Sequence, residues 1–551
     1  MSQIVADPTT ISRPVELPPP SGWRALARRA WVSERFWSWA GPLVVTLVGG
    51  YQRFWHLGTP HKLIFDETYY VKEGVSYLKY GIELTLKESI NANADKRNES
   101  ADRLFVAGHL DIFSSSPDRV VHPMVGKWMI AFGEWLFGPT SSVGWRFSVA
   151  LCGTLALLMV GRIAFRLFGS ALLATTAALL LAVDGQEFVH SRTGILDMFV
   201  MFWALAAFGC LLIDRDRTRV RLRAAVPPAP GRAAPGAGGD RRLGFGPWTG
   251  PRWWRVAALV CLGLCTGVKW SGIYFTAAFM LLSVCWDMAA RRAVGVRHWL
   301  AAGAQRDGAQ AFATTVLVYP AVYLATWVTW FATGNGWNRH WAEQNGPAEP
   351  GWAWVPDALR SLWHYHAETW AFHVALTSPH DWQANPWAWL VVGRPTLFFF
   401  DTHTRGHGGC HVQTCRQMIT DLGNPLIWWG ATLAVGVLLF RWLLSRDWRA
   451  GAVTVGLAAG YLPWFLYQKR TIFEFYAVAF VPWVVLAVTY CLALVLGPPE
   501  APPERRRTGA MVAGSYVFLC VVLFWYLFPI LAARTIPQAA VDVRDWLPSW
   551  Y

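Results

Sequence analysis

The chain has 551 residues, of which 54% are hydrophobic and only 15% are charged, and its formal net charge is +14. A soluble domain usually carries about 25% charged residues, so the composition argues against an ordinary soluble protein and favours an integral membrane protein. The basic excess lies in short Arg-rich stretches between apolar runs, not in a separate basic domain, and we therefore expect no nucleic-acid partner.

The N-terminal segment, residues 1–36, is polar and proline-rich, without the early apolar core and small-residue cleavage site of a signal peptide. We expect it to be a cytoplasmic tail, followed by one transmembrane domain over 37–533. A span needs roughly 20 apolar residues. About eleven segments are candidates: 37–55, 143–165, 171–186, 195–213, 254–269, 271–288, 312–332, 425–445, 451–467, 475–496 and 509–533. The sequence thus predicts an all-α polytopic membrane protein.

The positions of the arginines predict the topology. With the tail inside, the inner connections that carry arginines are 214–253, 289–308, 446–450 and 498–508. An odd number of spans then places the C-terminal tail, 534–551, outside. Residues 225–250 are rich in Pro, Gly and Ala, which predicts a disordered cytoplasmic linker.

Two outer connections, 56–142 and 333–424, are long. The first contains the acidic stretch "KLIFDETYY" and the amphipathic stretch "HPMVGKWMIAFGEWLFG", which predicts a helix along the membrane interface. The second is rich in Trp and His.

Charged residues gather near the predicted outer surface, and a charge at mid-bilayer would cost at least about 2.5–3.5 kcal/mol. They are Arg53, Asp66, Glu67, Arg146, Asp184, Glu187, Arg192, Asp197, Lys269, Lys469, Arg470 and Glu474. A single Arg or Lys could simply anchor at the interface, but short Asp side chains cannot snorkel far. Charges of both signs at the same depth in the membrane predict a polar cavity that opens outward. A channel or transporter would carry such groups through the membrane's depth, so we favour chemistry on a lipid-borne substrate.

The adjacent acids Asp66 and Glu67 suit the transfer of a sugar from a polyprenyl phosphate to a hydroxyl. Phosphate is a good leaving group, so the site needs one carboxylate as general base and fixed cations that bind the phosphate. If residues 65–70 are helical, neighbouring side chains diverge by about 100°. We therefore expect one acid to act as the base and the other to orient an arginine or the sugar.

Eight motifs occur in the order typical of protein O-mannosyltransferases of the GT-C superfamily: IFDETYY, VHPMVGKW, GWRFSVALCGTL, HSRTGILDMF, GVKWSGIYF, NPWAWL, GNPLIWW and KRTIFEFYA. The chain resembles this family, in an actinobacterial form without the β-trefoil MIR domain that eukaryotic members carry within the second outer connection. The resemblance implies a GT-C fold. It also implies an inverting transfer of mannose from polyprenyl-phosphate mannose to Ser or Thr of a translocating protein, without a metal or other cofactor.

The resemblance also implies roles for individual residues. Asp66 matches the base and Glu67 completes the acidic pair. Residues that match other functional positions of the family are Arg53, Arg146, His122 and Lys127, although Met124 replaces the second proline of the His-Pro-Pro…Lys motif.

Chemistry and position, more than the motif, make Arg470 our candidate for binding the donor phosphate, with Lys469 beside it. Arg192 and Asp197 are further candidates for the donor site. Asp197 could instead cap the fourth span at its N-terminus, where the helix dipole favours an acid. His122 could likewise cap the amphipathic helix.

The stretch "THTRGHGGCHVQTC", residues 402–415, contains Cys410 and Cys415 together with three histidines. Nitrogen and sulfur ligands at such spacing could bind zinc. Outside the cell a Cys-x4-Cys pair more often forms a disulfide, and we expect a disulfide here.

We therefore predict a mannosyltransferase of the plasma membrane that acts at its outer face on secreted or membrane proteins. Association with the Sec translocon is implied by the resemblance alone. Two alternatives stay open: a GT-C enzyme that uses the same donor on a glycolipid or glycan, and a transporter or flippase that forms no covalent product.

Overall fold

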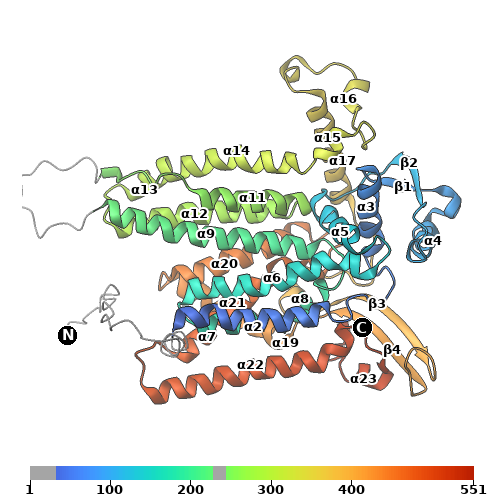
Figure 1. Ribbon diagram of the computed structural model, residues 1–551. Coiled ribbons are helices and arrows are strands. Elements are labelled where there is room, and N and C mark those ends of the chain that lie inside the picture. The colour runs from blue at the N-terminus through green and yellow to red at the C-terminus, as the bar shows by residue number, and fades with distance from the viewer. Residues whose placement is uncertain (1–32, 227–243, 551) are drawn as a thin grey trace, which may run out of the picture.

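Long helices lie side by side and make up most of the protein (Figure 1). The structure, a computed structural model, describes residues 33–226 and 244–550, so most of the expected N-terminal tail and the middle of the expected linker lie outside it. The helices at the eleven expected spans are α2 (Glu34–Phe54), α6 (Ser142–Phe168), α7 (Ala171–Ala182), α9 (Asp197–Ala225), α11 (Trp253–Val268), α12 (Gly272–Ala293), α14 (Ala309–Ala325), α19 (Pro425–Leu443), α20 (Trp448–Tyr461), α21 (Val481–Leu496) and α22 (Pro503–Leu531).

Within the described residues, 8 helical stretches are long and apolar enough to cross a membrane. One of them begins at α13 (Trp299–Ala302) and continues through a helical turn, Gly303–Gly308, into α14. Helices α7 and α11 are apolar but shorter. Every expected span is therefore helical, while the total of eleven crossings stays a prediction.

The turn between α6 and α7 shows how the sequence sets the helix ends. The side chain of Ser141 accepts a hydrogen bond from the backbone N–H of Gly144 at the start of α6. Gly169 ends this helix with φ of 67°, a conformation that costs glycine little. Ser170 then caps α7 by accepting from Leu173 N. Gly169 at the end of α6 and the cap Ser170 directly after it thus produce a sharp reversal between α6 and α7, while Ser141 caps the far end of α6.

The connection expected at 214–253 begins later than predicted. We predicted a loop from residue 214, but α9 continues to Ala225, so 214–225 are helical. Asp214 is buried and accepts hydrogen bonds from Arg252 just before α11, and the same guanidinium bonds to Asp287 on α12. This ionic contact holds the end of α9 against its neighbours, and arginine is a good helix former.

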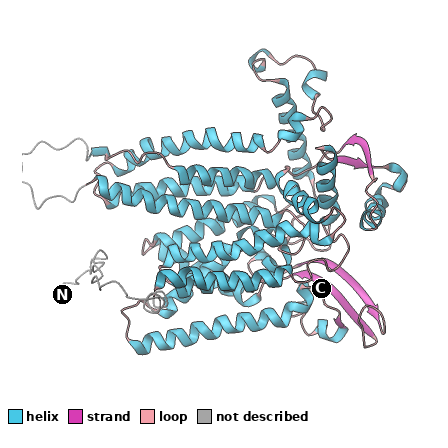
Figure 2. Ribbon diagram, viewed as in Figure 1, coloured by secondary structure: helices cyan, strands magenta, loops and turns pink. Residues whose placement is uncertain are grey.

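The outer connections fold into smaller elements, all gathered at one end of the bundle (Figures 1 and 2). The helices are α3 (Glu67–Tyr80), α4 (Ala94–Val106), α5 (Val125–Phe137), α8 (Gly185–His190), α15 (Val328–Ala332), α16 (Trp341–Gln344), α17 (Asp357–Ala375), α18 (Pro386–Trp389) and α23 (Gln538–Asp542), with shorter helical turns at Glu88–Ile90, Pro350–Trp352, Leu462–Tyr467, Glu474–Phe480 and Pro548–Trp550. The expected amphipathic helix is α5, and it packs closely on α6: a Cβ at Gly133 would lie 2.2 Å from the carbonyl oxygen of Gly144.

Five strands, which the all-α prediction did not include, lie at this same end (Figure 2). They are β1 (Leu84–Leu86), β2 (Phe113–Pro117), β3 (Thr396–Thr404), β4 (Thr414–Asp421) and β5 (Ile536–Pro537). β1 pairs with β2, and the second sheet has the order β3-β4-β5 with antiparallel neighbours. Because β5 belongs to the C-terminal tail, the tail lies at the end opposite to the start of α2, as an odd number of crossings requires (Figure 1).

The tip of the β3–β4 hairpin carries the expected disulfide, Cys410–Cys415. His403 contacts Gln417 across the hairpin, with 3.2 Å between Nε2 and Oε1. Among the residues that the structure describes, no group of three or more His, Cys, Asp or Glu side chains is arranged to hold a metal ion. The two cysteines therefore staple the hairpin covalently.

Candidate active site

The acidic pair lies where α3 begins, at the end of the bundle that carries the strands (Figure 1). Asp66 is the N-cap residue and Glu67 is the first helical residue. The preceding residue, Phe65, has φ of 48°, a backbone conformation that costs a non-glycine residue on the order of 1–3 kcal/mol. Its ring is held by stacking on Phe398, with 4.5 Å between centroids, and by an edge contact with Phe475 at 5.2 Å. This packing fixes the bend after which Glu67 is fully buried and Asp66 is half-buried.

Glu67 is enclosed by hydrogen-bond donors. Its Oε1 accepts from Arg146 Nε and from Gly194 N, both at 2.7 Å. Its Oε2 accepts from Arg146 Nη2 at 2.8 Å and from Ile64 N at 3.1 Å. The side chain is fully buried. Glu67 therefore does not face a substrate, and its contacts orient an arginine and the surrounding loop.

Arg146 has the same internal role, which corrects its expected place in the donor site. Beyond its two bonds to Glu67, it donates to the carbonyl oxygens of Leu57, Pro60 and Lys62 at 3.0–3.2 Å. All five N–H groups of a guanidinium are thereby used. Because the side chain is also fully buried, it has no donor left for a phosphate and instead holds the loop that precedes Asp66.

Asp66 faces a different environment, made of one hydroxyl and one ion pair. The Tyr70 hydroxyl lies 3.5 Å from its Oδ2. Nearby, Lys269 Nζ and Asp197 Oδ2 form an ion pair at 2.7 Å. Burial raises the pKa of Asp66 from 3.8 to about 6, while Lys269 lowers this pKa and Asp197 raises it. A carboxylate with a pKa near 6 is ionised at neutral pH, and it is a stronger base than an ordinary aspartate.

This pKa predicts how activity depends on pH. If Asp66 is the base, only its ionised form reacts, so kcat/KM should rise tenfold per pH unit below about pH 6 and level off above it. A phosphodiester donor does not titrate in this range. Rates measured between pH 4.5 and 8 test the prediction, with thermal unfolding at each pH to exclude acid denaturation. A flat profile from pH 5 to 7.5 would contradict the assignment.

A cavity of about 790 Å³, here called the polar cavity because charged and polar side chains stand among its aromatic lining, borders the ion pair that acts on Asp66, although Asp66 itself does not line it. Asp197 and Lys269, the charges that act on the Asp66 carboxylate, both line it. Other lining side chains include His122, Trp270, Tyr323, His366, Trp370, His373, Arg470 and Tyr476. They come from separate connections of the bundle and combine cations, imidazoles and aromatic rings, which suits an anionic group attached to a sugar.

His373 on α17 orients the cation of this cavity. Its Nε2 lies 2.8 Å from the Val121 carbonyl oxygen and must carry the proton, which leaves Nδ1 to accept from Arg470 Nη2 at 3.2 Å. Burial, together with the nearby cations Arg470 and Lys269, lowers the pKa of His373 to about 4, so the ring is neutral. Arg470 Nε is buried and has no hydrogen-bond partner within the described ranges. Arg470 thus lines the cavity and keeps one donor unused.

His122, expected in the donor site, also lines the cavity, while its role there stays a prediction. Its ring stacks on His373 with 5.3 Å between centroids. Burial lowers the pKa of His122 well below its ordinary value, and the cations Lys269 and Lys127 act in the same direction. Both imidazoles are therefore neutral, which leaves Lys269 and Arg470 as the cations that line the cavity.

Two arginines expected in the donor site are turned into the protein. Arg53 is fully buried, forms a short ion pair with Glu187 and donates to Gly49 O at 3.0 Å. Arg192 donates to four carbonyl oxygens at the C-terminal end of α2, those of Gln52, Arg53, Trp55 and His56. A cation is favoured at this end of a helix, and both arginines therefore fix the loop that leads to Asp66.

The two lysines of the expected donor set do not line the cavity either. Lys127 is fully buried, forms ion pairs with Glu73 and Glu83 at 3.1 Å, and donates to His122 O at 2.9 Å. It holds the backbone of His122 in place. Lys469 is exposed, beside Arg470 but outside the lining.

The sequence reasoning missed His366, His373 and Tyr476. The two histidines lie seven residues apart on α17, a spacing that puts them on one helix face, and this spacing could have been noticed. His366 is fixed in a chain of hydrogen bonds: Trp270 Nε1 donates to the Tyr323 hydroxyl at 3.0 Å, and that hydroxyl lies 2.7 Å from His366 Nε2. The sequence carried no signal for this contact between distant helices.

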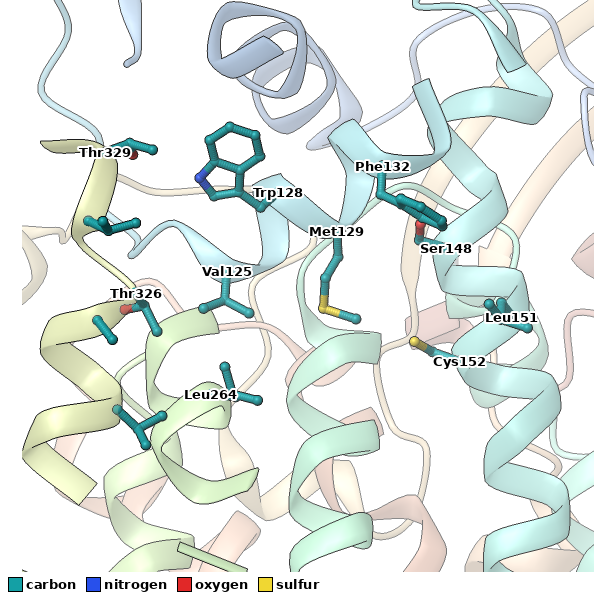
Figure 3. Close-up of a pocket in the computed structure, with 13 residues that line it drawn as sticks. Val125, Trp128, Met129, Phe132, Ser148, Leu151, Cys152, Leu264, Thr326 and Thr329 are labelled. Carbon is teal, nitrogen blue, oxygen red and sulfur yellow. The ribbon is translucent and has the colours of Figure 1, made fainter. Parts of the chain in front are cut away.

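A second cavity, a groove of about 620 Å³, does not suit sugar chemistry. Figure 3 shows its side chains: Val125, Trp128, Met129 and Phe132 of α5 lie near Leu151 and Cys152 of α6, and Leu264 and Thr326 complete the wall. The few polar groups are hydroxyls such as those of Ser148 and Thr329. Because it contains no charged residue, we place the chemistry in the polar cavity.

Comparison with known proteins identifies the family. Residues 121–222 match the family described as dolichyl-phosphate-mannose-protein mannosyltransferase, and residues 358–550 match the C-terminal four TMM region of protein-O-mannosyltransferase. A polyprenol-phosphate-mannose–protein mannosyltransferase from Mycolicibacterium smegmatis is 37% identical over 529 residues, covering 94% of both chains. The chain belongs to the polyprenol-phosphate-mannose–protein mannosyltransferase family. The expected family is therefore confirmed.

Other relatives of this mannosyltransferase agree. The enzyme of the same name from Mycobacterium tuberculosis is 39% identical over 78% of this chain and 81% of its own, and that from Corynebacterium glutamicum is 35% identical over 78% and 81%. Among solved structures, the Saccharomyces cerevisiae Pmt1-Pmt2 complex bound to the sugar donor matches with a TM-score of 0.65 at 12% sequence identity, covering 94% of this chain and 93% of that one. The GT-C fold is thus confirmed.

Proposed function

We propose that the protein transfers mannose from a polyprenyl-phosphate mannose to Ser or Thr hydroxyls of proteins, with Asp66 as general base. The observation that carries this proposal is the division of the acidic pair: Glu67 is sealed by four hydrogen bonds, while Asp66 is half-buried beside a polar cavity with two cations. The other carboxylate at the cavity, Asp197, is ion-paired with Lys269, so Asp66 is the carboxylate that stays available as a base. A reaction whose leaving group is a phosphate needs only one such group.

The reaction follows from these positions. The Asp66 carboxylate takes the proton of the acceptor hydroxyl, and the hydroxyl oxygen forms a bond to the anomeric carbon of mannose. The bond from that carbon to the phosphate oxygen breaks on the opposite face, so the configuration inverts. Polyprenyl phosphate leaves, and Arg470 and Lys269 stabilise the charge that develops on it, as preorganised cations do in other transferases. His373 and His122 orient Arg470 and close the cavity.

We place this chemistry at the outer face of the plasma membrane, since the Arg-rich connections lie at the opposite end of the bundle (Figure 1). Acceptors would then arrive as extended chains from a translocon, with which we propose the enzyme associates. In this proposal the two cations that line the cavity within the described residues, Lys269 and Arg470, take the role that a metal ion would have at the phosphate.

The test is an assay with purified enzyme and labelled polyprenyl-phosphate mannose. We expect label in a Thr-containing peptide and none in a matched peptide with Val at that position, and NMR of the product should show inverted anomeric configuration. Transfer to a glycolipid but not to the peptide would favour the glycolipid alternative. Movement of the donor across a liposome membrane without a covalent product would favour a flippase.

A further inference from the structure

The outer edge of strand β3 is open. β3 runs over nine residues, Thr396–Thr404, and pairs only with β4 among the described strands, while β4 is covered on its other side by β5. Natural sheets usually protect an edge of this length with lysines, prolines, bulges or a covering element. β3, with the sequence TLFFFDTHT, has no Lys or Pro, and its one register shift lies at its inner end, between Leu397 and Phe399.

The register shows which backbone groups point to this edge. The N–H of Thr402 donates to the side chain of Asp401 at 2.9 Å, so it faces away from β4. In an antiparallel pair the direction alternates at every residue, so Phe400 faces the same way. Both residues are exposed, Phe400 at 41%. The N–H and C=O of Phe400 and the C=O of Thr402 are therefore free to pair with another extended chain.

This edge starts beside the proposed base. Phe398 at the inner end of β3 stacks on Phe65, the residue before Asp66. Further out, Lys62 forms an ion pair with Asp401 at 2.9 Å and lies 5.7 Å from the centre of the Phe399 ring. The loop that carries Asp66 thus contacts β3 at two places, first at Phe398 and then at Phe399 and Asp401.

The polar cavity borders the Asp197–Lys269 pair that acts on Asp66, and elements other than the β3–β4 sheet form it. Its lining residues come from the loop before α5, from α9, α11, α12, α14, α17 and α20, from the α11–α12 connection and from the segment around Arg470, and none comes from β3 or β4. A cavity filled by a lipid-linked sugar would leave the β3 side as the approach for the second substrate. Phe475 lies between the two sides: its ring contacts Phe65 and Phe398, and Lys269 lies 5.9 Å from its centre.

We propose that the acceptor polypeptide adds as an extended strand to the free edge of β3, which delivers its Ser or Thr to Asp66. This inference rests on the proposed function and names how its acceptor is recognised. Main-chain hydrogen bonds supply affinity in such strand addition, and they are independent of side-chain sequence. This mode of recognition suits an enzyme whose acceptors share only a hydroxyl group. Successive side chains of an added strand point to opposite faces of the sheet and not toward the neighbouring strand, so they need not match β3.

An acceptor scan tests the proposal on the full-length enzyme. A nine-residue peptide with one Thr is methylated at one backbone nitrogen at a time, which removes a donor and blocks pairing. We expect kcat/KM to fall by roughly tenfold at alternate positions on one side of the Thr and little at the positions between them, since each alternate position loses one hydrogen bond and the methyl group adds a clash. Equal losses at all positions, or none, would overturn the proposal.

Phe400→Pro tests the strand itself, because proline removes the free N–H without taking a bond from the β3–β4 ladder. We expect the ratio of kcat/KM for the peptide to kcat/KM for N-acetylthreonine amide to fall by roughly tenfold. Phe400→Val, which keeps the N–H, is the matched control and should hold the ratio within about twofold. An unchanged ratio in Phe400→Pro would overturn the proposal. A variant that keeps the ratio but changes its oligomeric state would also overturn it, because the edge of β3 would then pair with a second copy of the chain.

The same assay separates the two levels of inference. If the wild-type enzyme mannosylates neither the peptide nor N-acetylthreonine amide, the proposed function fails. If it mannosylates both and the N-methyl scan shows no alternation, the function stands and strand addition is wrong.

Discussion

Replacement of Asp66 by Asn is expected to lower kcat by about 10²–10⁴-fold, because a general base contributes a factor of this size and an amide cannot take the proton of the acceptor hydroxyl. The substitution keeps the shape of the side chain, and the hydroxyl of Tyr70 remains within reach of the new amide. Donor binding should change little, since the cations that line the cavity are untouched. The measurement is single-turnover transfer to a Thr peptide with labelled donor.

Asp111→Asn is the matched control for this prediction. Asp111 lies in the same outer connection, its side chain is 89% exposed, and its only charged partner in the described chain is Lys87. The same chemical change there should leave kcat unaltered. If Asp66→Asn keeps more than a tenth of the wild-type rate while the protein stays folded, Asp66 is not the base.

Replacement of Arg146 by Met is expected to destabilise the protein by about 3–5 kcal/mol, because removal of one partner leaves the other charge buried and uncompensated. Glu67 and Arg146 are both fully buried, so solvent cannot compensate the carboxylate. The carbonyl oxygens of Leu57, Pro60 and Lys62 would lose their donor as well. The free energy of unfolding in detergent, together with transfer activity, measures the effect, and we expect both to fall.

Arg103→Met provides the comparison for the buried pair. Arg103 and Glu99 form an ion pair on α4 in which both side chains are 71% exposed. Exposed pairs contribute about 0–1 kcal/mol, so this variant should unfold almost like the wild type. Combining Glu67→Gln with Arg146→Met should recover part of the lost stability, because the unpaired buried charge is then gone. A loss below 1 kcal/mol in Arg146→Met would refute the structural role.

Much of the fold could be predicted from the sequence because it depends on local properties. A run of about 20 apolar residues must be helical in a membrane, where every backbone group has to be satisfied within the segment. Each expected span accordingly coincides with a helix. The boundary at residue 214 was wrong because Asp214 meets Arg252 and Asp287, residues on other helices that no local pattern reveals.

The candidate site was predicted less completely. The sequence places a charge at a level of the membrane, but the direction of its side chain depends on the neighbours that the fold brings to it. Arg53, Arg146, Arg192 and Lys127 share this level with Arg470, yet only Arg470 lines the cavity. The first four meet carbonyl oxygens and carboxylates inside the protein, and a buried cation needs such partners.

The sequence by itself determined the membrane class, the candidate spans, the position of the acidic pair and the divergence of its two side chains, because hydropathy, charge and the helical repeat act over a few residues. Only the tertiary structure decided that Glu67 is sealed, that His373 aims Arg470, and that β3 leaves an open edge beside Phe65. These features arise from contacts between residues that are about 80 to more than 300 positions apart, and their energies depend on which helix ends and loops meet at this end of the bundle.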